Sequence, residues 1–474
     1  MYACAVGSQR KNWYSGGKHI KGIGKAAVNI QLPDKVKHII DILNRNGYEA
    51  YAVGGCVRDS LLGRIPEDWD ITTSALPLQV KALFARTIDT GLQHGTVTVM
   101  SGREGFEVTT YRIDGEYEDS RHPKEVCFTP SLLEDLKRRD FTMNAMAYND
   151  QAGLVDAFDG AGDLQKGIVR CVGNPTERFQ EDALRILRAV RFAAQLDFKI
   201  EEGTRQAIQK LAGDLKKISA ERIQAELVKL VVSPHPEWML ELYELGISKV
   251  ILPEFDCMMR TGQNHPHHCS SVGEHTVHAM EHVAQDKILR LTMLFHDIAK
   301  PQCKTTDEEG IDHFYGHPAK SAELAKRIFR RLKFDRETMD AVCALVRWHD
   351  YNPPLEREKV RRAIMKVGEK QYPAVFAVKR ADILAQSEYQ RECKLAYVDA
   401  YEKMYGEILA EGNCISLKQL AVTGSDIMEL GVKQGKQIGD ILKELLELVV
   451  KDPAKNEREY LLQQAQRYID QMCL

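Results

Sequence analysis

The periodicity of apolar residues changes near Thr176, and this change limits the folds open to the chain. Before it, short alternating runs such as 96–100 and 106–111 are separated by turn residues, which predicts strands and, across 101–105, a hairpin. After it, apolar residues recur at three- and four-residue intervals, as in 438–449, which predicts helices. The sequence therefore predicts an α+β fold with a small mixed sheet near the N-terminus, followed by a long all-α remainder.

Length and composition narrow the class of protein further. The chain has 474 residues, and roughly 100–200 residues per domain suggests about three units. The formal net charge is -3, so RNA binding would require local clusters of Lys and Arg. No apolar run is long enough to span a bilayer, which argues against a membrane protein.

Eleven cysteines without a close CxxC pair argue against a disulfide framework and a zinc ribbon, so we expect a cytoplasmic protein. The oligomeric state stays open.

Residues 1–28 contain five Lys or Arg and no acidic residue. The segment lacks the sustained apolar core of a secretory signal. Transit peptides are also poor in acids, but the segment shows no clear amphipathic periodicity. We interpret it as a flexible basic leader.

A glycine turn followed by two carboxylates carries the strongest chemical signal. A strand-like run leads into Gly54 and Gly55 and then into a helix, a pattern in which backbone N–H groups can approach a phosphate. Asp68 and Asp70 share one face of an extended segment. Two neighbouring acids repel each other unless a cation lies between them, and carboxylates with phosphate oxygens are typical Mg²⁺ ligands. An isolated pair of this kind is usually a solvated edge strand, but the preceding turn weakens that interpretation.

The string 54–73 resembles the motif GGxVRDxLLGRxxxDxDxxT of the class II tRNA nucleotidyltransferases, which include CCA-adding enzymes and bacterial poly(A) polymerases. The resemblance implies a DNA polymerase β-like nucleotidyltransferase head. It also implies that Asp68 and Asp70 are catalytic and bind the metal, with Glu107 as a third carboxylate. Gly55 and Arg58 would then bind the nucleotide.

Two following segments resemble the same family. Residues 112–123 are similar to the loop with which CCA-adding and A-adding enzymes accept ATP, although His122 stands where an arginine is usual. Residues 138–145 are similar to the ribose-reading motif, which implies that Arg139 and Asp140 face the nucleotide. A carboxylate can accept a hydrogen bond from a ribose 2′-OH.

A helix predicted across 181–192 offers a way to select bases without a template. Asp182 and Arg185 are three residues apart and would be neighbours on its surface. A carboxylate beside a guanidinium complements the Watson–Crick edges of cytosine and adenine and opposes those of guanine and uracil, which would leave buried polar groups unpaired. The helix resembles the family's EDxxR motif, which implies that Arg188 and Arg191 are further nucleotide-binding residues.

A second set of residues suits a metal. Residues 265–282 are rich in histidine, and His296-Asp297 follows. Imidazole and carboxylate together bind divalent metals. The order His275, His296-Asp297, Asp382 is similar to the HD phosphohydrolase superfamily, which implies a divalent metal such as Mg²⁺, Mn²⁺ or Ni²⁺. His317 and His349 match positions that complete a second site in some members.

Residues 420–442 also resemble the tail of the same family, which binds tRNA. Together, the sequence patterns and these resemblances imply five regions: the leader (1–28), the nucleotidyltransferase head (29–160), a helical neck and start of body for nucleotide selection and RNA binding (161–260), the HD domain (261–390) and a tRNA-binding helical tail (391–474). The implied function is addition of CCA to tRNA 3′ ends from CTP and ATP with Mg²⁺ in the head. A second phosphatase or phosphodiesterase activity would act on cyclic or terminal phosphates of nucleotides or RNA ends.

Three alternatives remain at this point. An A-adding enzyme or a poly(A) polymerase shares the head motifs. A phosphohydrolase with a non-catalytic RNA-binding head is opposed by the intact acids of the head. A non-catalytic RNA-binding protein is opposed by the number of metal and nucleotide groups that occur in family order.

Overall fold

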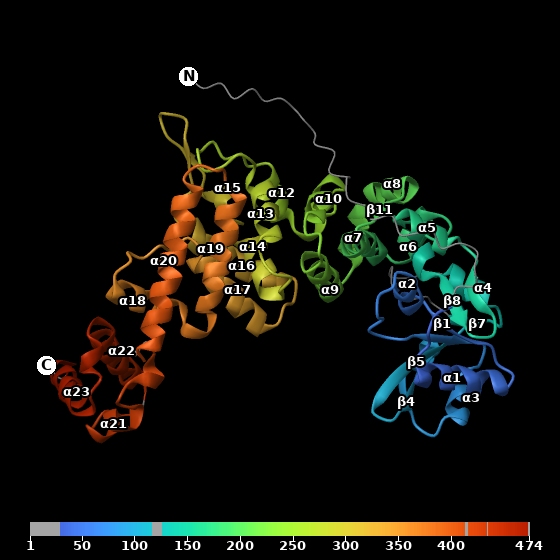
Figure 1. Cartoon of the computed structure of the whole chain (residues 1–474), viewed down its shortest axis with the longest axis horizontal. Coiled ribbons are helices and arrows are strands. Elements are labelled where there is room, and N and C mark those ends of the chain that lie inside the picture. The colour runs from blue at the N-terminus through green and yellow to red at the C-terminus, as the bar shows by residue number, and fades with distance from the viewer. Residues whose placement is uncertain (1–28, 116–125, 413–415, 434, 473–474) are drawn as a thin grey trace. The chain divides into compact units, whose positions relative to one another are not determined.

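The computed structural model describes residues 29–115, 126–412, 416–433 and 435–472 (Figure 1). The chain divides into two compact units, residues 1–251 and 252–474. The predicted basic leader (1–28) and most of the predicted ATP loop (116–123) lie outside the described residues. The finer boundaries predicted inside the two units stay predictions.

The first unit contains a seven-stranded sheet of order β3-β4-β5-β2-β1-β8-β9. β2 and β5 are parallel, whereas the other neighbouring pairs are antiparallel, so the predicted mixed sheet is confirmed. The predicted hairpin is formed by β4 and β5. The strands are β1 (Ala50–Val53), β2 (Ile71–Thr73), β3 (Thr87–Gly91), β4 (Thr96–Ser101), β5 (Glu104–Thr110), β8 (Met146–Asn149) and β9 (Gly153–Asp156). β6 (Arg112–Asp114) and β7 (Val126–Phe128) form a separate pair.

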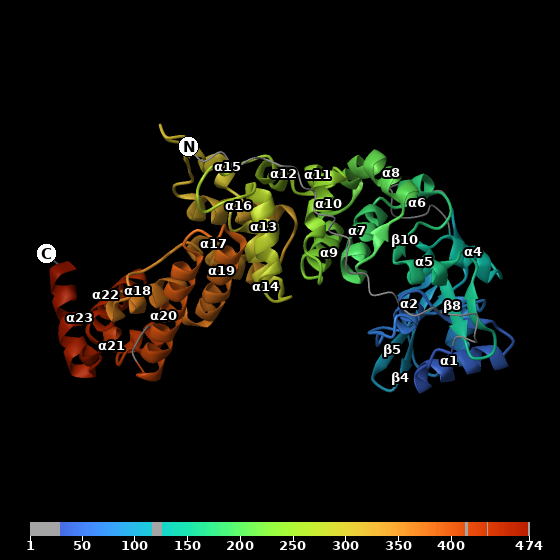
Figure 2. The ribbon, with the colours of Figure 1, turned by 45° about the horizontal axis from the view of Figure 1, so that its top comes forward.

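Short helices surround this sheet. α1 (Asp34–Arg45) buries Val36, Ile39, Ile40 and Leu43 and packs on β1 and β2, while α3 (Pro77–Leu83) packs on β4 and β5. α2 (Gly55–Leu61) begins directly after β1 and contacts β1 and β8, and Figure 2 shows α2 beside β8. α4 (Leu132–Lys137) and α5 (Gly160–Lys166) complete the region. The sheet thus places the end of β1 and the start of β2 next to α2.

The rest of the first unit is helical apart from the short parallel pair β10 (Ile168–Val169) and β11 (Lys199–Ile200). The prediction of one helix across 181–192 is wrong, because α6 ends at Glu181 and α7 begins at Leu184. Asp182 lies between them in an extended conformation, and its carboxylate accepts the Leu184 N–H at 3.0 Å. A short acid that bonds the backbone locally competes with helix formation. The helices are α6 (Pro175–Glu181), α7 (Leu184–Leu196), α8 (Glu202–Leu211), α9 (Ala220–Val231), α10 (Trp238–Glu244) and α11 (Ser248–Ile251).

Over its described residues the second unit is almost entirely helical, as predicted, with one short hairpin of β12 (Thr305–Thr306) and β13 (Asp312–His313). α13, α14, α16, α17 and α19 pack on one another in its first half. The helices there are α12 (Pro253–Met259), α13 (Val272–Glu281), α14 (Lys287–Phe295), α15 (Lys300–Cys303), α16 (His317–Arg331), α17 (Arg336–Trp348), α18 (Arg357–Val367) and α19 (Tyr372–Ala385).

The C-terminal helices add two apolar cores to this unit. α20 (Arg391–Ala410) packs on α18 and α19 through buried aromatic residues that include Tyr372, Phe376 and Tyr401. α21 (Gly424–Glu429), α22 (Lys436–Lys451) and α23 (Arg458–Met472) enclose a second core. Among the described residues, no helix combines the length and apolar character that crossing a membrane requires.

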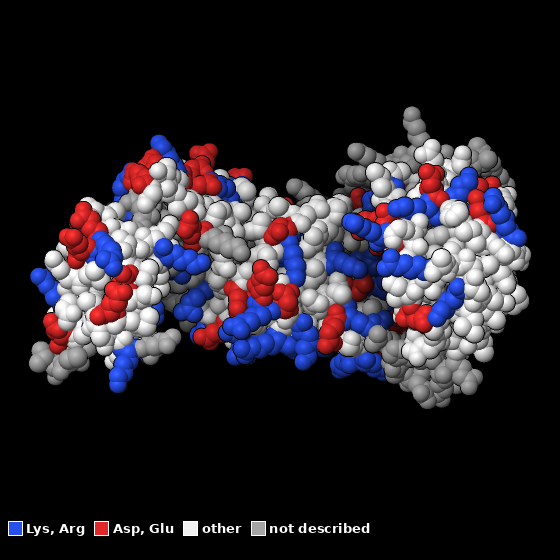
Figure 3. Space-filling model, turned by 90° about the horizontal axis from the view of Figure 1, so that it is seen from below, with Lys and Arg blue, Asp and Glu red and all other residues white. Residues whose placement is uncertain are grey.

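Charged side chains are unevenly distributed over the surface. On the face drawn in Figure 3, Lys and Arg gather in several groups with Asp and Glu between them. The formal net charge of -3 therefore does not exclude local basic surfaces of the kind that bind a phosphate backbone.

Candidate functional site

Three carboxylates lie where β2 and β5 run side by side. Asp68 and Asp70 precede β2, which begins at Ile71, so the acids lie just before the strand rather than on it. Glu107 lies in β5 directly before Val108, and Val108 is the register partner of Ile71. Asp70 and Glu107 therefore occupy matching positions on neighbouring parallel segments. All three acids are exposed.

The electrostatics of these carboxylates fit a cation site. Partial desolvation by neighbouring atoms, and then the negative charges of Asp70 and Asp68, raise the pKa of Glu107. Partial desolvation also raises the pKa of Asp70, the positive charge of Arg139 lowers it, and the negative charge of Asp68 raises it. Acids that raise one another's pKa are stabilised in their charged form when a divalent cation lies between them.

The glycine turn brings an arginine close to these acids. Gly54 has φ +83°, and a Cβ added there would lie 2.9 Å from Arg139 Nη1. A larger residue would therefore displace the guanidinium. Arg139 Nη2 lies 3.6 Å from Asp135 Oδ2, while its Nε is buried with no hydrogen-bond partner among the described residues. A buried donor without a partner is costly, and an anionic ligand would relieve that cost.

A chain of hydrogen bonds connects the predicted nucleotide-binding residues. Arg58, in α2 behind Gly55, donates from Nη1 to Asn144 Oδ1 at 2.8 Å, and Asn144 donates from Nδ2 to Asp140 Oδ1 at 3.0 Å. Arg188 donates from Nη2 to Asp140 Oδ2 at 2.6 Å. Burial would raise the pKa of Asp140, but Arg188 and Asn144 outweigh it and hold that pKa well below its usual range. Asp140 is therefore ionised and can act only as an acceptor.

The predicted pair Asp182 and Arg185 is held by two separate sets of partners. Asp182 receives both terminal nitrogens of Arg222, at 2.7 and 3.3 Å. Arg185 donates to Glu181 Oε2 at 2.6 Å and to the Arg138 carbonyl at 2.9 Å. The backbones of the two residues are in contact, because the Arg185 N–H donates to the Asp182 carbonyl at 3.0 Å. Their side chains, however, are oriented by different neighbours.

Sequence reasoning missed the residues of α9 that orient this region. Besides Arg222, α9 supplies Glu226, which is buried and bonds Arg191 Nε at 2.8 Å. The guanidinium carbons of Arg191, Arg58 and Arg188 lie 3.5, 5.0 and 5.3 Å from the centre of the Phe192 ring. Spacing of four residues puts Arg222 and Glu226 on one helix face. No sequence signal, however, connects that face to 182–192.

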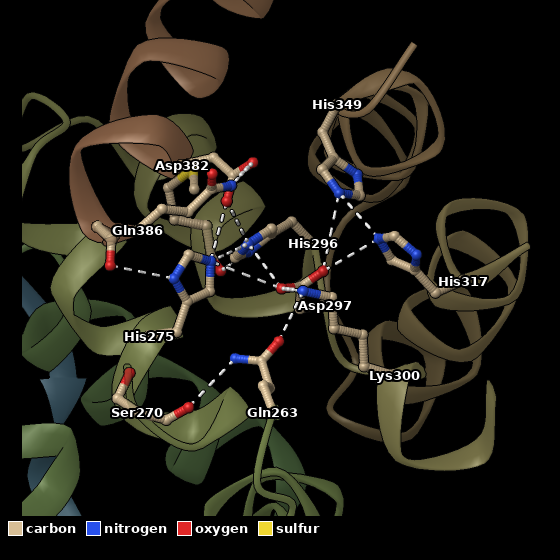
Figure 4. Close-up of polar contacts among 12 residues, drawn as sticks. Gln263, Ser270, His275, His296, Asp297, Lys300, His317, His349, Asp382 and Gln386 are labelled. Carbon is tan, nitrogen blue, oxygen red and sulfur yellow. Dashed lines mark hydrogen bonds and ion pairs between the residues drawn. The ribbon is translucent and has the colours of Figure 1, made fainter. Parts of the chain in front are cut away.

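The second site lies in the second unit and brings together four predicted ligands (Figure 4). His275 Nε2 lies 2.9 Å from Asp382 Oδ1 and 3.6 Å from Asp297 Oδ2, and His296 Nε2 lies 3.2 Å from the same Asp297 oxygen. The backbone orients the imidazoles, since His296 Nδ1 faces the Met293 carbonyl at 2.7 Å. Such contacts leave the Nε2 atoms facing the acids, as in metal sites of this type.

The two further histidines lie on the other side of Asp297. His317 Nε2 is 3.2 Å and His349 Nε2 is 3.8 Å from Asp297 Oδ1, and the two imidazole nitrogens are 3.3 Å apart. Both Asp297 oxygens are buried without a hydrogen bond of normal geometry among the described residues, although Lys300 Nζ lies 2.7 Å away. Asp297 thus faces two histidine pairs, one through each oxygen.

The charges of this group are strongly coupled. Burial opposes ionisation of Asp297, but His296 and Lys300 outweigh it and hold its pKa well below the usual range. Burial would lower the pKa of His296, whereas Asp297 and Asp382 raise it to about 10. These residues fit one or two divalent metals chemically, because their Nε2 and carboxylate atoms converge and would exchange mutual contacts for metal bonds. A cavity of about 660 Å³ opens beside the group.

Three family models match the chain. Residues 50–170 match the "Poly A polymerase head domain", residues 197–259 match the "Probable RNA and SrmB- binding site of polymerase A", and residues 305–465 match "tRNA nucleotidyltransferase domain 2 putative".

Similar curated proteins are CCA-adding enzymes. The alignment with that of Lactobacillus helveticus is 51% identical and spans 45% of this chain, but only 54% of the relative. The chain thus spans about half the length of this relative, and the same holds for the CCA-adding enzymes of Ligilactobacillus salivarius (53%) and Lactiplantibacillus plantarum (51%). The alignment with the CCA-adding enzyme of Levilactobacillus brevis is 34% identical and covers 91% of this chain and 98% of the relative.

A solved structure agrees with the sequence relatives. The CCA-adding enzyme of Bacillus stearothermophilus in complex with CTP matches with a TM-score of 0.68 and 29% identity, over 92% of this chain and 98% of that chain. The match includes both units of this chain. Because a relative at 34% identity is aligned over nearly its whole length, the chain belongs to the CCA-adding enzyme family of tRNA nucleotidyltransferases.

Proposed function

We propose that the protein adds C, C and A in turn to the 3′ end of tRNA, with CTP and ATP as substrates. The observation that carries this proposal is the placement of Asp68, Asp70 and Glu107 beside the Gly54 turn and the partnerless Nε of Arg139. Membership of the family supports the same activity. Nucleotidyltransferases of this kind need divalent metals, and we propose Mg²⁺ here.

In the proposed reaction the tRNA 3′-hydroxyl oxygen forms a bond to the α-phosphorus of the nucleotide. The bond from that phosphorus to the oxygen bridging the α- and β-phosphates breaks, pyrophosphate leaves, and the hydroxyl proton passes to water. Asp68, Asp70 and Glu107 would hold the metal, which neutralises charge that develops on the phosphate oxygens. Asp140, ionised by Arg188, would accept the ribose 2′-OH hydrogen bond. Arg58 and Arg139 would bind phosphate oxygens through their guanidinium groups.

Base selection is the proposed task of Asp182 and Arg185. The Asp182 carboxylate would accept the amino group of cytosine or adenine, and Arg185 would donate to the ring nitrogen. The bidentate contact of Arg222 orients the Asp182 carboxylate. Its oxygens accept hydrogen bonds, and guanine and uracil would present a carbonyl oxygen, a second acceptor, at the same place. The neck and tail regions, 161–260 and 391–474, are proposed to bind the tRNA. The cytoplasmic location stays a prediction.

Nucleotide incorporation tests the proposal. A tRNA transcript that lacks CCA is incubated with Mg²⁺ and CTP, ATP or both, and the products are resolved to one nucleotide. We expect two additions with CTP and a third only when ATP is present. A single A added only to tRNA that already ends in CC would make the protein an A-adding enzyme, and long A tails would make it a poly(A) polymerase.

We also propose a phosphohydrolase activity for the second unit, carried by Asp297 and the two histidine pairs that face its oxygens. Water would form a bond to the phosphorus of a phosphoester, the P–O bond to the leaving group would break, and the leaving oxygen would take up a proton. A bound divalent metal would lower the pKa of the attacking water. Candidate metals are Mg²⁺, Mn²⁺ and Ni²⁺.

Hydrolysis of 4-nitrophenyl phosphate and of a nucleoside 2′,3′-cyclic phosphate tests this activity. Each metal is added in turn to protein previously treated with a chelator. Release of product that depends on one of the metals supports the activity. No release with any metal, from protein that still adds CCA, would refute the second function and leave the first intact.

A further inference from the structure

A row of rings lies along the cavity of the second unit, outside the ligand group itself. In the order Tyr315, His313, His265, His267 and Tyr389, neighbouring ring centres are 5.3, 6.5, 4.8 and 4.9 Å apart. The first four line the cavity. Tyr315 is 76% exposed and Tyr389 is 50% exposed. Two large aromatic side chains are therefore open to solvent at the two ends of one row, where burial in a core does not explain them.

Backbone contacts fix the segment that carries the central histidines. Asn264 and Asp312 exchange two hydrogen bonds, from Asn264 N–H to Asp312 Oδ2 at 2.7 Å and from Asp312 N–H to the Asn264 carbonyl at 2.9 Å. The Ser387 N–H donates to the His267 carbonyl at 2.9 Å. The rings thus come from three segments that are joined to one another, so binding would order few groups.

The row continues to the metal-binding group through His268. The His268 ring centre lies 6.3 Å from that of His265 and 5.2 Å from that of His275. Its Nδ1 is buried with no hydrogen-bond partner among the described residues. A polar atom in that position is costly unless a ligand or water satisfies it.

A lysine beside the row supplies positive charge. Lys394 Nζ bonds Gln386 Oε1 at 2.6 Å and His267 Nδ1 at 2.9 Å. Both acceptors are neutral, and no ion pair of Lys394 with a carboxylate occurs in the described part of the chain. Lys394 also lines the cavity. The ammonium group is therefore placed to attract an anion near the rings.

We propose that His265, His267, His313, Tyr315 and Tyr389 bind the bases of a single-stranded RNA 3′ end, whose terminal phosphate lies at the Asp297 group. This inference rests on the proposed phosphohydrolase function and names its substrate class. Aromatic and imidazole rings stack with any base, and a neighbouring cation follows the backbone. A single nucleotide would cover only part of the row, whereas a strand of two or three nucleotides would use its full length.

Binding of a fluorescent probe tests the proposal on the full-length protein. The probe is a trinucleotide with a 3′-phosphate and 2-aminopurine at its last position, whose fluorescence is quenched on stacking. A 2-aminopurine nucleoside 3′-phosphate separates the RNA end from a free nucleotide. We expect the trinucleotide to bind about tenfold more tightly, in line with stacking contributions measured per base.

Substitutions of one ring then locate the contact. Tyr315→Leu is expected to weaken trinucleotide binding about tenfold, while Tyr315→Phe, which keeps the ring, binds like the unchanged protein. The rate of 4-nitrophenyl phosphate hydrolysis, which needs no base stacking, should be equal in the unchanged protein, Tyr315→Leu and Tyr315→Phe. Phe128→Leu, which removes an exposed ring of the first unit, is the matched control and should leave binding unchanged.

Equal affinity for the trinucleotide and the mononucleotide would overturn the proposal. So would unchanged binding in both Tyr315→Leu and Tyr389→Leu, or loss of binding in Phe128→Leu. The outcome for the phosphohydrolase is separate. If no metal supports hydrolysis but Tyr315→Leu still weakens trinucleotide binding about tenfold, the RNA site stands and the hydrolytic function fails.

Discussion

The two carboxylate sites of this protein respond in opposite ways to the same electrostatic rules. In the first unit, Asp68, Asp70 and Glu107 are accessible to solvent. Partial desolvation by neighbouring atoms and the negative charges of neighbouring acids raise the pKa values of Asp70 and Glu107. In the second unit, Asp297 is buried, yet its pKa is held low by His296 and Lys300. The first site thus has several negative charges close together, whereas in the second site cationic side chains surround the negative charge of Asp297.

The difference indicates how each site would acquire a metal. The acids of the first unit repel one another, so a cation brought with a nucleotide triphosphate would remove an unfavourable interaction. The second site already holds its ligands together through mutual contacts. A metal there would replace those contacts, and the group would be largely preformed. Substitutions in each site should therefore have separate effects.

The largest effect is expected for Asp70→Asn. The change removes a negative charge that would hold the metal at the reacting phosphate. Because such a metal stabilises the transition state by several kcal/mol, the rate of single-turnover CMP addition should fall by about 10⁴-fold. Hydrolysis by the second unit should not change. Glu104→Gln is the control, because Glu104 is an exposed acid of the same strand as Glu107 and pairs with Lys35 at 2.9 Å. A loss smaller than tenfold in Asp70→Asn would contradict the proposed role.

The reciprocal change is Asp297→Asn. We expect phosphoester hydrolysis to fall by about 10³-fold, since the residue faces both histidine pairs and would support the activation of water. CMP and AMP addition should remain within about twofold. Metal binding measured by calorimetry should weaken in parallel with hydrolysis. Equal loss of both activities would show that the two sites are not independent, and the comparison above would fail.

The fold was largely predictable, whereas the orientation of side chains in the first site was not. The strand-like run predicted before Gly54 is β1, and the apolar spacing of 438–449 corresponds to α22. Alternation and helical spacing are local properties, so a sequence carries them directly. The continuous helix across 181–192 was wrong because Asp182 bonds the Leu184 N–H, a local competition that apolar spacing does not reveal.

The features that the sequence did not predict depend on contacts between segments that are distant in the chain. Arg222 bonds Asp182 across 40 residues, and Gln263 accepts from Lys300 across 37 residues at 3.0 Å. Both interactions follow from how helices pack, and neither residue belongs to a recognisable motif. The histidines and aspartates of the second site could be proposed because their order along the chain matches a known pattern. Their pairing around the two oxygens of Asp297 required the structure.

Glu226→Ala tests how much α9 contributes to the stability of the first unit around Arg191. Glu226 bonds Arg191 at 2.8 Å, and both side chains are less than one-tenth exposed. Loss of the acid would leave a buried guanidinium without its carboxylate, so the free energy of unfolding should fall by about 3 kcal/mol. Thermal and denaturant unfolding of the first unit would measure it, with the second unit's transition unchanged. Glu221→Ala, an exposed acid of the same helix, is the control.

The smallest effect is expected for Arg222→Ala, and it concerns selectivity rather than rate. Arg222 holds the Asp182 carboxylate through two hydrogen bonds, and hydrogen bonds to charged groups contribute about 1.5–3 kcal/mol. If part of that energy orients Asp182 toward the base, the ratio of kcat/KM for CTP to that for UTP should fall about tenfold, while the kcat for CTP changes less. Arg222→Lys keeps the charge but loses the bidentate geometry, so an intermediate ratio is expected. Lys229→Ala, an exposed residue of the same helix, should leave the ratio unchanged. An unchanged ratio in Arg222→Ala would mean that α7 and the nucleotide orient Asp182 without α9, and that the contact with Arg222 serves stability alone.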